Sequence, residues 1–488
     1  MRTRLSLRGA PRRAVVALLF AQCLFAVCGA AEPIAPAGTR RPAPSRDAAA
    51  MPWPAPGPRQ TAPNFEAPSA GNCMRPVQAV EVPGWAPGQS AGTPGDAMRD
   101  AARAGDAPAS EAALAAAPLV KRAAPAFAPE PPRPAPRQRQ EAEQVTAGMV
   151  DDNADFSAYL QFLRKHVQVP HRARDVRERY LLQVRTPAGE AVPDAEVAVR
   201  GAGGAAMWAR TDSAGRAWLH PRAFDPHGDA RYRVAVRKDG RQAEGVLELG
   251  QKSAVEVVLD AAPQPARARL DLLFLVDATG SMDDEIAKLR ASLGSIAGEV
   301  ARLPSRPDLC LGLVAYRDRG DAFLLRRYDL SNDLVGFQAA LDALRADGGG
   351  DYPEAMNEAF HEAVHGIDWR GSGTTRLVVL LADAPPHLDY GGPQYDQDML
   401  AALGKGIKVF PVGASGLNRQ GEYVQRQIAQ YTGGRFVFLT YEDAADPASG
   451  PGRKTVHDVR NYSIQTLDKL IVRLVRDELD KLPRGGKG

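Results

Sequence analysis

The chain has 488 residues, enough for two or three domains, and carries a formal net charge of +3. Its first 31 residues hold five arginines and no acidic residue, so the rest of the chain carries −2 (+3 less 5). A slightly acidic total gives no electrostatic basis for binding nucleic acid, and we expect no such partner.

Residues 1–31 predict a secretory signal peptide, with a basic start, an apolar core at 14–27 and a small-residue exit. The apolar core is shorter than the ~20 residues that span a membrane. Cys28 raises the alternative of a lipid anchor, although Val27 is bulkier than the residue that normally precedes a lipidated cysteine. We expect an exported protein of the periplasm or cell envelope, or a secreted one. A lipid anchor would be its only link to a membrane.

Residues 32–144 are dominated by Pro, Ala, Gly and Arg and show little hydrophobic periodicity. Such a segment cannot bury enough apolar surface to offset the entropy lost on ordering. We predict a disordered linker with extended polyproline stretches. It is either a spacer between the folded part and the cell surface or a neutral tail.

Two cysteines remain beyond the signal peptide. Cys73 lies in the low-complexity linker, and Cys310 lies in an apolar strand pattern. Two such cysteines do not predict a disulfide framework, even in an oxidising compartment. We therefore predict that Cys310 is a small buried hydrophobic residue.

Residues 145–262 predict a short helix followed by a small β-sandwich. The helix is expected within 151–167, and apolar and polar residues alternate in short runs between 178 and 260. The turn Thr211-Asp-Ser-Ala-Gly215 resembles that of bacterial immunoglobulin-like and carboxypeptidase-regulatory-like modules. Such modules space or bind, and no constellation of residues here suggests catalysis.

From residue 268 the pattern changes to alternating strands and helices. We expect buried strands at 270–276, 309–315, 377–381, 409–412 and 436–439, and helices at 282–301, 334–346, 353–367, 397–403 and 423–431. Near-continuous apolar strands with helical crossovers predict an α/β fold, a doubly wound and mostly parallel sheet with helices on both faces.

A candidate metal site begins where the first of these strands ends. Asp277-Ala-Thr-Gly-Ser281 places a carboxylate and two hydroxyls at i, i+2 and i+4 in a strand-to-helix turn. Magnesium takes oxygen ligands in near-octahedral geometry. Open α/β folds bind ligands at the carboxyl ends of their strands, where this turn lies.

With this motif, residues 268–442 resemble a von Willebrand factor type A domain. The metal-ion-dependent adhesion site of that family uses a D-x-S/T-x-S turn, which Asp277, Thr279 and Ser281 match. Asp383, at the end of a later strand, matches the family's second aspartate. The resemblance implies a bound Mg²⁺, or Mn²⁺ or Ca²⁺, with one coordination position open for an acidic group of a protein partner.

The last metal ligand departs from the family pattern. Most members offer a threonine where this chain has Gly348-Gly-Gly-Asp-Tyr-Pro-Glu-Ala355. This loop is similar to a GGGDxPEA loop of bacterial members and to a D-x-P-E loop of integrin β chains. Asp351 or Glu354 is therefore the expected extra ligand, and the sequence does not decide between them. A carboxylate there predicts tighter cation binding with less attraction for an anionic partner.

Three further motifs have alternative interpretations. Met282-Asp-Asp-Glu285 could hold a second calcium ion, as in integrin β chains, or stabilise the start of a helix through its dipole. Arg319-Gly-Asp321 is interpreted as turn sequence rather than an integrin ligand. His361-Glu-Ala-Val-His365 matches the HExxH pattern of zinc proteases, but its helix is expected to place both histidines on the solvated side, with no further zinc-ligand motif.

Residues 443–488 predict a loop followed by an amphipathic helix within 463–482. Taken together, the patterns predict an exported, non-enzymatic protein that binds or adheres to a protein partner through a divalent metal. One alternative is a structural cell-envelope protein that the metal merely stabilises. The other is a zinc metalloprotease that uses the HExxH motif.

Overall fold

The computed structural model describes residues 73–84, 145–262 and 267–483, except residue 351. The predicted signal peptide and most of the predicted linker lie outside these residues. In this part of the chain, each helix is too short or too polar to cross a membrane.

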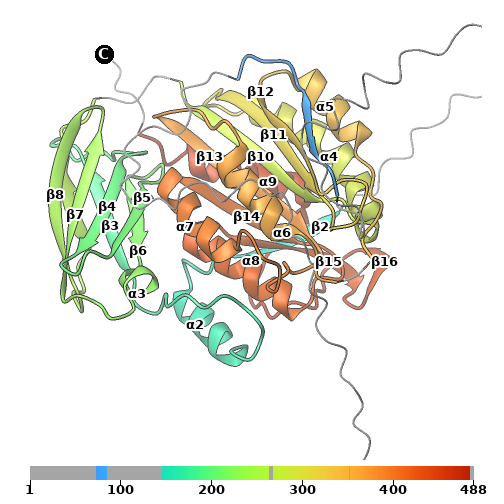
Figure 1. The fold of residues 1–488 in the computed structure, drawn as a ribbon. Coiled ribbons are helices and arrows are strands. Elements are labelled where there is room, and N and C mark those ends of the chain that lie inside the picture. Colours follow the sequence, from blue (N-terminus) through green and yellow to red (C-terminus); the bar gives the residue numbers. More distant parts are fainter. Residues whose placement is uncertain (1–72, 85–144, 263–266, 351, 484–488) are drawn as a thin grey trace, which may run out of the picture. The chain divides into compact units, whose positions relative to one another are not determined.

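A large mixed sheet forms the centre of the fold (Figure 1). Its strand order is β1-β12-β11-β10-β13-β14-β15-β2-β17, and β16 pairs with β15 outside this path. The strands are β1 (Ala79–Val82), β2 (Thr146–Val150), β10 (Arg269–Asp277), β11 (Asp308–Tyr316), β12 (Leu325–Ser331), β13 (Thr374–Ala382), β14 (Ile407–Gly413), β15 (Phe436–Asp443), β16 (Asp446–Pro451) and β17 (Gln465–Thr466). Strands β11, β10, β13, β14 and β15 are parallel, while the outer strands run antiparallel to their neighbours.

Helices cover both faces of this sheet, as the apolar strands require. One face carries α4 (Asp283–Ala301), α5 (Leu334–Ala343) and α9 (Leu467–Leu479), and the other carries α6 (Met356–His361), α7 (Tyr395–Lys405) and α8 (Arg419–Thr432) (Figure 1). Successive residues of β10 pack into the two layers alternately: Leu272 and Phe274 join the first, and Leu273 and Leu275 the second. The expected α/β architecture is confirmed.

Two smaller sheets form from residues 180–258. One has the order β6-β3-β9 and the other β5-β4-β7-β8. Their strands are β3 (Tyr180–Arg185), β4 (Glu196–Gly201), β5 (Ala206–Arg210), β6 (Arg216–Leu219), β7 (Arg231–Lys238), β8 (Arg241–Glu248) and β9 (Val255–Val258). Both sheets contribute to one apolar cluster, through residues such as Val184 and Val234. Two short helices accompany them, α2 (Phe156–Lys165) and α3 (Pro221–Phe224).

The large sheet takes in strands that the sequence pattern did not indicate. Residues 79–82, inside the predicted linker, form β1 and pair with β12. Residues 146–150, assigned above to the smaller β region, form β2 and pair with β15. Part of the predicted loop after residue 442 forms β16. These strands lie at or near the margins of the sheet and are short, so they lack the long apolar runs that mark the central strands.

The prediction for the cysteines is wrong. Cys310 is buried in β11 as expected, but it forms a disulfide with Cys73, across a sequence separation of 237 residues. The same segment is held by backbone hydrogen bonds, from Asn332 N to Cys73 O (3.0 Å) and from Leu324 N to Val82 O (2.9 Å). Residues 73–84 are therefore an integral edge of the domain.

Candidate functional site

Two aspartates leave neighbouring parallel strands at the same edge of the sheet. Asp277 is the last residue of β10, and Asp383 directly follows β13. The pairing of Val276 with Leu381 puts the two strand ends level. The two predicted carboxylates therefore lie together at the carboxyl ends of the strands, where open α/β folds bind ligands.

The turn after β10 is organised around the Asp277 carboxylate. The backbone N–H and the hydroxyl of Thr279 both donate to Asp277 Oδ1, at 3.0 and 2.7 Å. The hydroxyl oxygens of Thr279 and Ser281 lie 3.3 Å apart. A short 3₁₀ turn, Gly280–Met282, then leads into α4. The motif thus gathers three oxygen-bearing side chains as the sequence predicted.

The glycine-rich loop lies against this turn. Gly280 N donates to Gly348 O at 3.0 Å. A Cβ on Gly349, whose φ is +69°, would lie 2.9 Å from both Thr279 Cβ and Glu354 Oε1. Glycine is thus required for the close approach that brings Glu354 next to Thr279.

The Arg-Gly-Asp tripeptide supports the same loop. Asp321 Oδ2 accepts hydrogen bonds from Gly349 N (2.9 Å) and from Asp318 N (3.0 Å). Arg319 forms an ion pair with the buried Glu358 at 2.9 Å. These contacts fit the interpretation of the tripeptide as structural turn sequence.

Glu354 reaches the site from the loop that precedes α6. Its backbone is tied to the segment that follows Asp383, because Glu354 N donates to Pro385 O (3.1 Å) and His387 N donates to Glu354 O (3.3 Å). The residue is 4% exposed. The alternative ligand, Asp351, lies outside the described residues. The structure therefore brings Glu354 to the predicted site and leaves the choice between the two open.

Each of the three buried carboxylates keeps one oxygen without the partner that a buried charge normally needs. Asp277 is 0% exposed and Asp383 is 4% exposed. Among the described residues, Asp277 Oδ2, Asp383 Oδ1 and Glu354 Oε2 have no hydrogen-bond partner. In the same part of the chain, no Lys, Arg or His forms an ion pair with any of the three carboxylates.

Burial and mutual repulsion raise the pKa values of these three carboxyl groups. Burial, followed by the charge of Asp383, raises the pKa of Asp277 to about 7. Burial and the neighbouring carboxylates, with Asp277 the strongest, raise the pKa of Glu354 to about 9. Burial also raises the pKa of Asp383. A bound cation would favour the charged form of each carboxyl group and reverse these shifts.

The donor set fits a hard divalent cation, because it consists of carboxylate and hydroxyl oxygens alone. Asp277, Thr279, Ser281, Asp383 and Glu354 are the side chains that would hold it. Such an ion would offer an electrophilic position to an anionic oxygen of a ligand.

Asp318 is an acid near the site that was not singled out in the sequence, whereas Glu285 was considered there only for a second ion. Asp318, 2% exposed, follows β11 just as Asp277 ends β10, and its charge helps to raise the pKa of Glu354. Its place shortly after an apolar strand was the signal that could have revealed it. Glu285 of the acidic run 282–285 accepts a hydrogen bond from Ser415 Oγ and helps to raise the pKa of Asp383.

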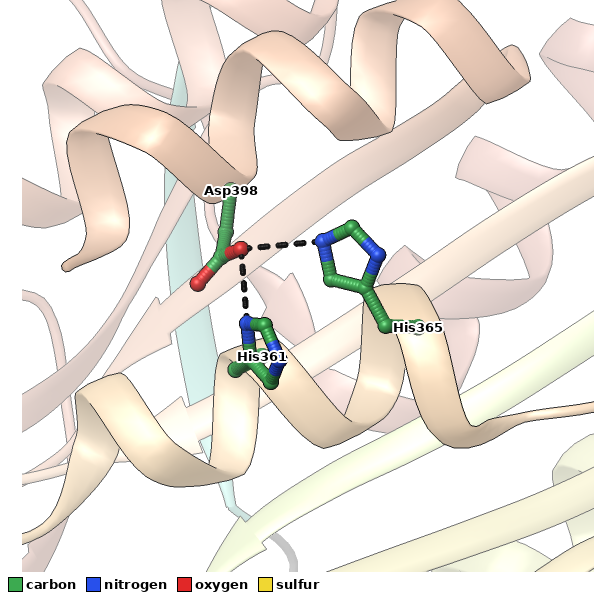
Figure 2. Close-up of side chains that lie close together, drawn as sticks. All are labelled: His361, His365 and Asp398. Carbon is green, nitrogen blue, oxygen red and sulfur yellow. Dashed lines mark hydrogen bonds and ion pairs between the residues drawn. The ribbon is translucent and has the colours of Figure 1, made fainter. Parts of the chain in front are cut away.

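The prediction that both HExxH histidines lie on the solvated side is wrong for His361 and confirmed for His365, which is exposed. His361 is 7% exposed rather than on a solvated face, and both histidines contact Asp398 of α7 (Figure 2). His361 is buried because α7 packs beside this helix. Asp398 is thus a third side chain that could bind a metal, although no sequence motif indicates it.

Comparison with protein families supports a protein with a von Willebrand factor A domain. The family model described as "von Willebrand factor A domain" matches residues 271–386. This segment contains Asp277, Thr279, Ser281, Glu354 and Asp383.

Two curated proteins are similar to parts of the chain. The alpha-protein kinase vwkA of Dictyostelium discoideum is 30% identical over 138 residues, which cover 28% of this chain and 22% of that protein. A putative ariadne-like RING finger protein, R811, of Acanthamoeba polyphaga mimivirus is 31% identical over 126 residues, covering 25% and 12%. The chain thus spans less than a quarter of the length of either relative.

Among solved structures, the pilus adhesin SpaC of Lactobacillus rhamnosus GG in its open conformation is 14% identical, with a TM-score of 0.25. The match covers 43% of this chain and 31% of the adhesin.

Proposed function

We propose that this chain is an exported, non-enzymatic protein that binds a protein partner through a divalent cation held at the carboxyl ends of β10 and β13. The cation is Mg²⁺, with Mn²⁺ or Ca²⁺ as substitutes. Asp277, Thr279, Ser281 and Asp383 hold it, together with Glu354 or Asp351. An acidic side chain of the partner completes its coordination.

The observation that carries this proposal is the set of buried carboxylate oxygens without hydrogen-bond partners. Leaving charged groups buried and unpaired is unfavourable, so such a set is retained where a cation compensates it. The match to the von Willebrand factor A domain supports a role in protein–protein interaction. The disulfide between Cys73 and Cys310 supports an oxidising compartment, in line with export.

Metal binding is tested by thermal unfolding of the chelator-stripped protein in increasing MgCl₂. At 100 times the dissociation constant, the ion should stabilise the wild type by about 2.7 kcal/mol. Asp277→Ala should abolish the response. Asp342→Asn, which changes an exposed aspartate of α5, is the matched control and should respond like the wild type. A wild type that does not respond to MgCl₂ would refute the site.

Partner binding is tested by capture from a cell-envelope extract on the immobilised protein, with MgCl₂ or with EDTA. The proposal requires a captured protein that is lost both in EDTA and with Asp277→Ala. Capture that is indifferent to EDTA would contradict it. A metal response without any metal-dependent capture would instead favour the structural role.

A further inference from the structure

A second group of metal-ligating side chains lies between α6 and α7. His361 Nδ1 is 3.0 Å from Asp398 Oδ1, and His365 Nε2 is 3.1 Å from the same oxygen (Figure 2). The candidate ligand atoms of the three residues all lie within 4.8 Å of one another. None of the three belongs to the strand-end site described above.

The local backbone explains why the two histidines face the same way. After His361, α6 passes into a single π-helical turn, Glu362–Gly366, with Ile367 N donating to Glu362 O at 3.2 Å. Residues four apart lie on the same face of a helix. The two imidazole rings are accordingly 4.5 Å apart between centroids. Single π-helical turns inside helices are rare and are frequent at functional sites.

Burial and charge favour a cation at this point. The side chains of His361 and Asp398 are 9% and 5% exposed, while that of His365 is 28% exposed. Asp398 Oδ2 is buried and accepts no hydrogen bond from the described residues. In that part of the chain, the ion-pair partners of Asp398 are the two histidines alone. The nearby Lys405 instead donates to the backbone oxygen of Val364 at 2.8 Å.

We propose that His361, His365 and Asp398 form a Zn²⁺ site that links α6 to α7. Two imidazole nitrogens and one carboxylate oxygen suit zinc and do not suit Mg²⁺, which prefers oxygen. Tetrahedral zinc with bonds of 2.0–2.2 Å places its ligand atoms about 3.4 Å apart. The two nitrogen–oxygen separations are already close to that value, so small side-chain movements admit the ion. The partly exposed His365 marks the side from which a water can take the fourth position.

The same geometry argues for a structural ion rather than a protease. Glu362, which would be the general base of an HExxH protease, forms an ion pair with Arg327 of β12. Arg327 also donates to the backbone oxygen of Gly366 at 3.0 Å. The Glu362 carboxylate is therefore held by Arg327 of the large sheet. The ion would cross-link two helices that pack on the same face of the sheet.

The test uses the full chain without a histidine tag, stripped of metal and titrated with ZnCl₂ by calorimetry and thermal unfolding. We expect one tight Zn²⁺ site and a higher unfolding temperature in the wild type. Losing one protein ligand should weaken binding at least about a hundredfold, as expected from the smaller losses at outer-shell positions. His365→Gln and Asp398→Asn should both show this loss. His227→Gln, at an exposed histidine, should bind Zn²⁺ like the wild type.

Asp277→Ala separates the two metal sites, because Zn²⁺ binding should persist in that variant. Retention of the MgCl₂ response by His365→Gln would show that this variant is folded. Co²⁺ provides a direct signature, the strong visible absorption of a four-coordinate ion, which should be absent in Asp398→Asn. The proposal is overturned if the wild type does not bind Zn²⁺, or if binding survives in both His365→Gln and Asp398→Asn; its loss in Asp277→Ala would then place the ion at the strand-end site.

Discussion

Glu354 shows, at the scale of single residues, what the strand-end site gains from a cation. Without metal, burial and the neighbouring carboxylates raise its pKa to about 9, so the folded protein holds a proton that the unfolded chain releases above its ordinary pKa of 4.5. The stability contributed by this proton is complete below pH 4.5 and is lost as the pH rises through 9. A bound cation would instead compensate the charge of the ionised Glu354 carboxylate.

Glu354→Gln should therefore have opposite effects with and without metal. In EDTA the variant should unfold at a higher temperature than the wild type at pH 7, and the difference should grow towards pH 9, because an amide carries no charge to bury. Its Mg²⁺ affinity at pH 7.5 should fall at least about tenfold if Glu354 is a ligand. Calorimetric titration and thermal unfolding measure the two effects.

Asp351→Asn is the matched comparison, since it changes the other candidate ligand in the same loop. If Asp351→Asn weakens Mg²⁺ binding while Glu354→Gln does not, Asp351 is the extra ligand. If neither variant binds Mg²⁺ more weakly, the loop does not supply a ligand, and the prediction of a carboxylate in place of threonine is wrong.

At this scale, sequence predicted best where a functional residue directly follows a strong local pattern. Asp277 and Asp383 each end an apolar run, so both their position and their common edge could be inferred. The role of Asp398 could not be inferred, because its contact with His361 depends on how α7 packs beside α6. The exposure of His361 was mispredicted for the same reason.

At the scale of elements, β1 depends on contacts that are remote in sequence. Cys73 is bonded to Cys310, and Ala79–Val82 pairs with Leu325–Tyr328. Composition indicated disorder around this segment because each short piece lacks apolar area of its own. The sheet edge of β12 supplies the missing partner, and no local pattern could show that.

The disulfide should contribute substantially to stability because it closes a long loop of the unfolded chain. Cys73→Ala should lower the free energy of unfolding by about 2–5 kcal/mol, measured by denaturation in urea. Reducing the wild type should have the same effect, and reducing the variant should have no further effect. Detection of free thiols at Cys73 and Cys310 in the folded, unreduced protein would contradict the bond.

At the scale of the whole described molecule, buried polar contacts join the smaller sheets to the large one. Asp194, which precedes β4, forms ion pairs with Arg210 of β5 (2.7 Å) and with Arg376 of β13 (2.9 Å). Burial would raise the pKa of Asp194, but the two arginines lower it to about 2. His220, between β6 and α3, is 0% exposed and stacks on Tyr431 of α8, with ring centroids 5.0 Å apart.

His220 should make this arrangement sensitive to mild acid. Burial, and then the charge of Arg179, lowers its pKa to about 3, from 6.5. Below pH 6.5, His220 therefore binds a proton in the unfolded chain but stays neutral in the folded protein. The free energy of unfolding falls as the pH drops towards 3. At pH 5 the loss relative to pH 8 should be roughly 2 kcal/mol from this group.

His220→Phe keeps an aromatic ring against Tyr431 and removes the titrating group, so its free energy of unfolding should fall less than that of the wild type between pH 8 and 5. Asp194 does not confound this window, because with its pKa near 2 its contribution is lost only below about pH 4. Urea denaturation at each pH measures the difference. His227→Gln, at an exposed position, should follow the wild type. Parallel pH profiles for the wild type and His220→Phe would show that His220 is not buried in its neutral form.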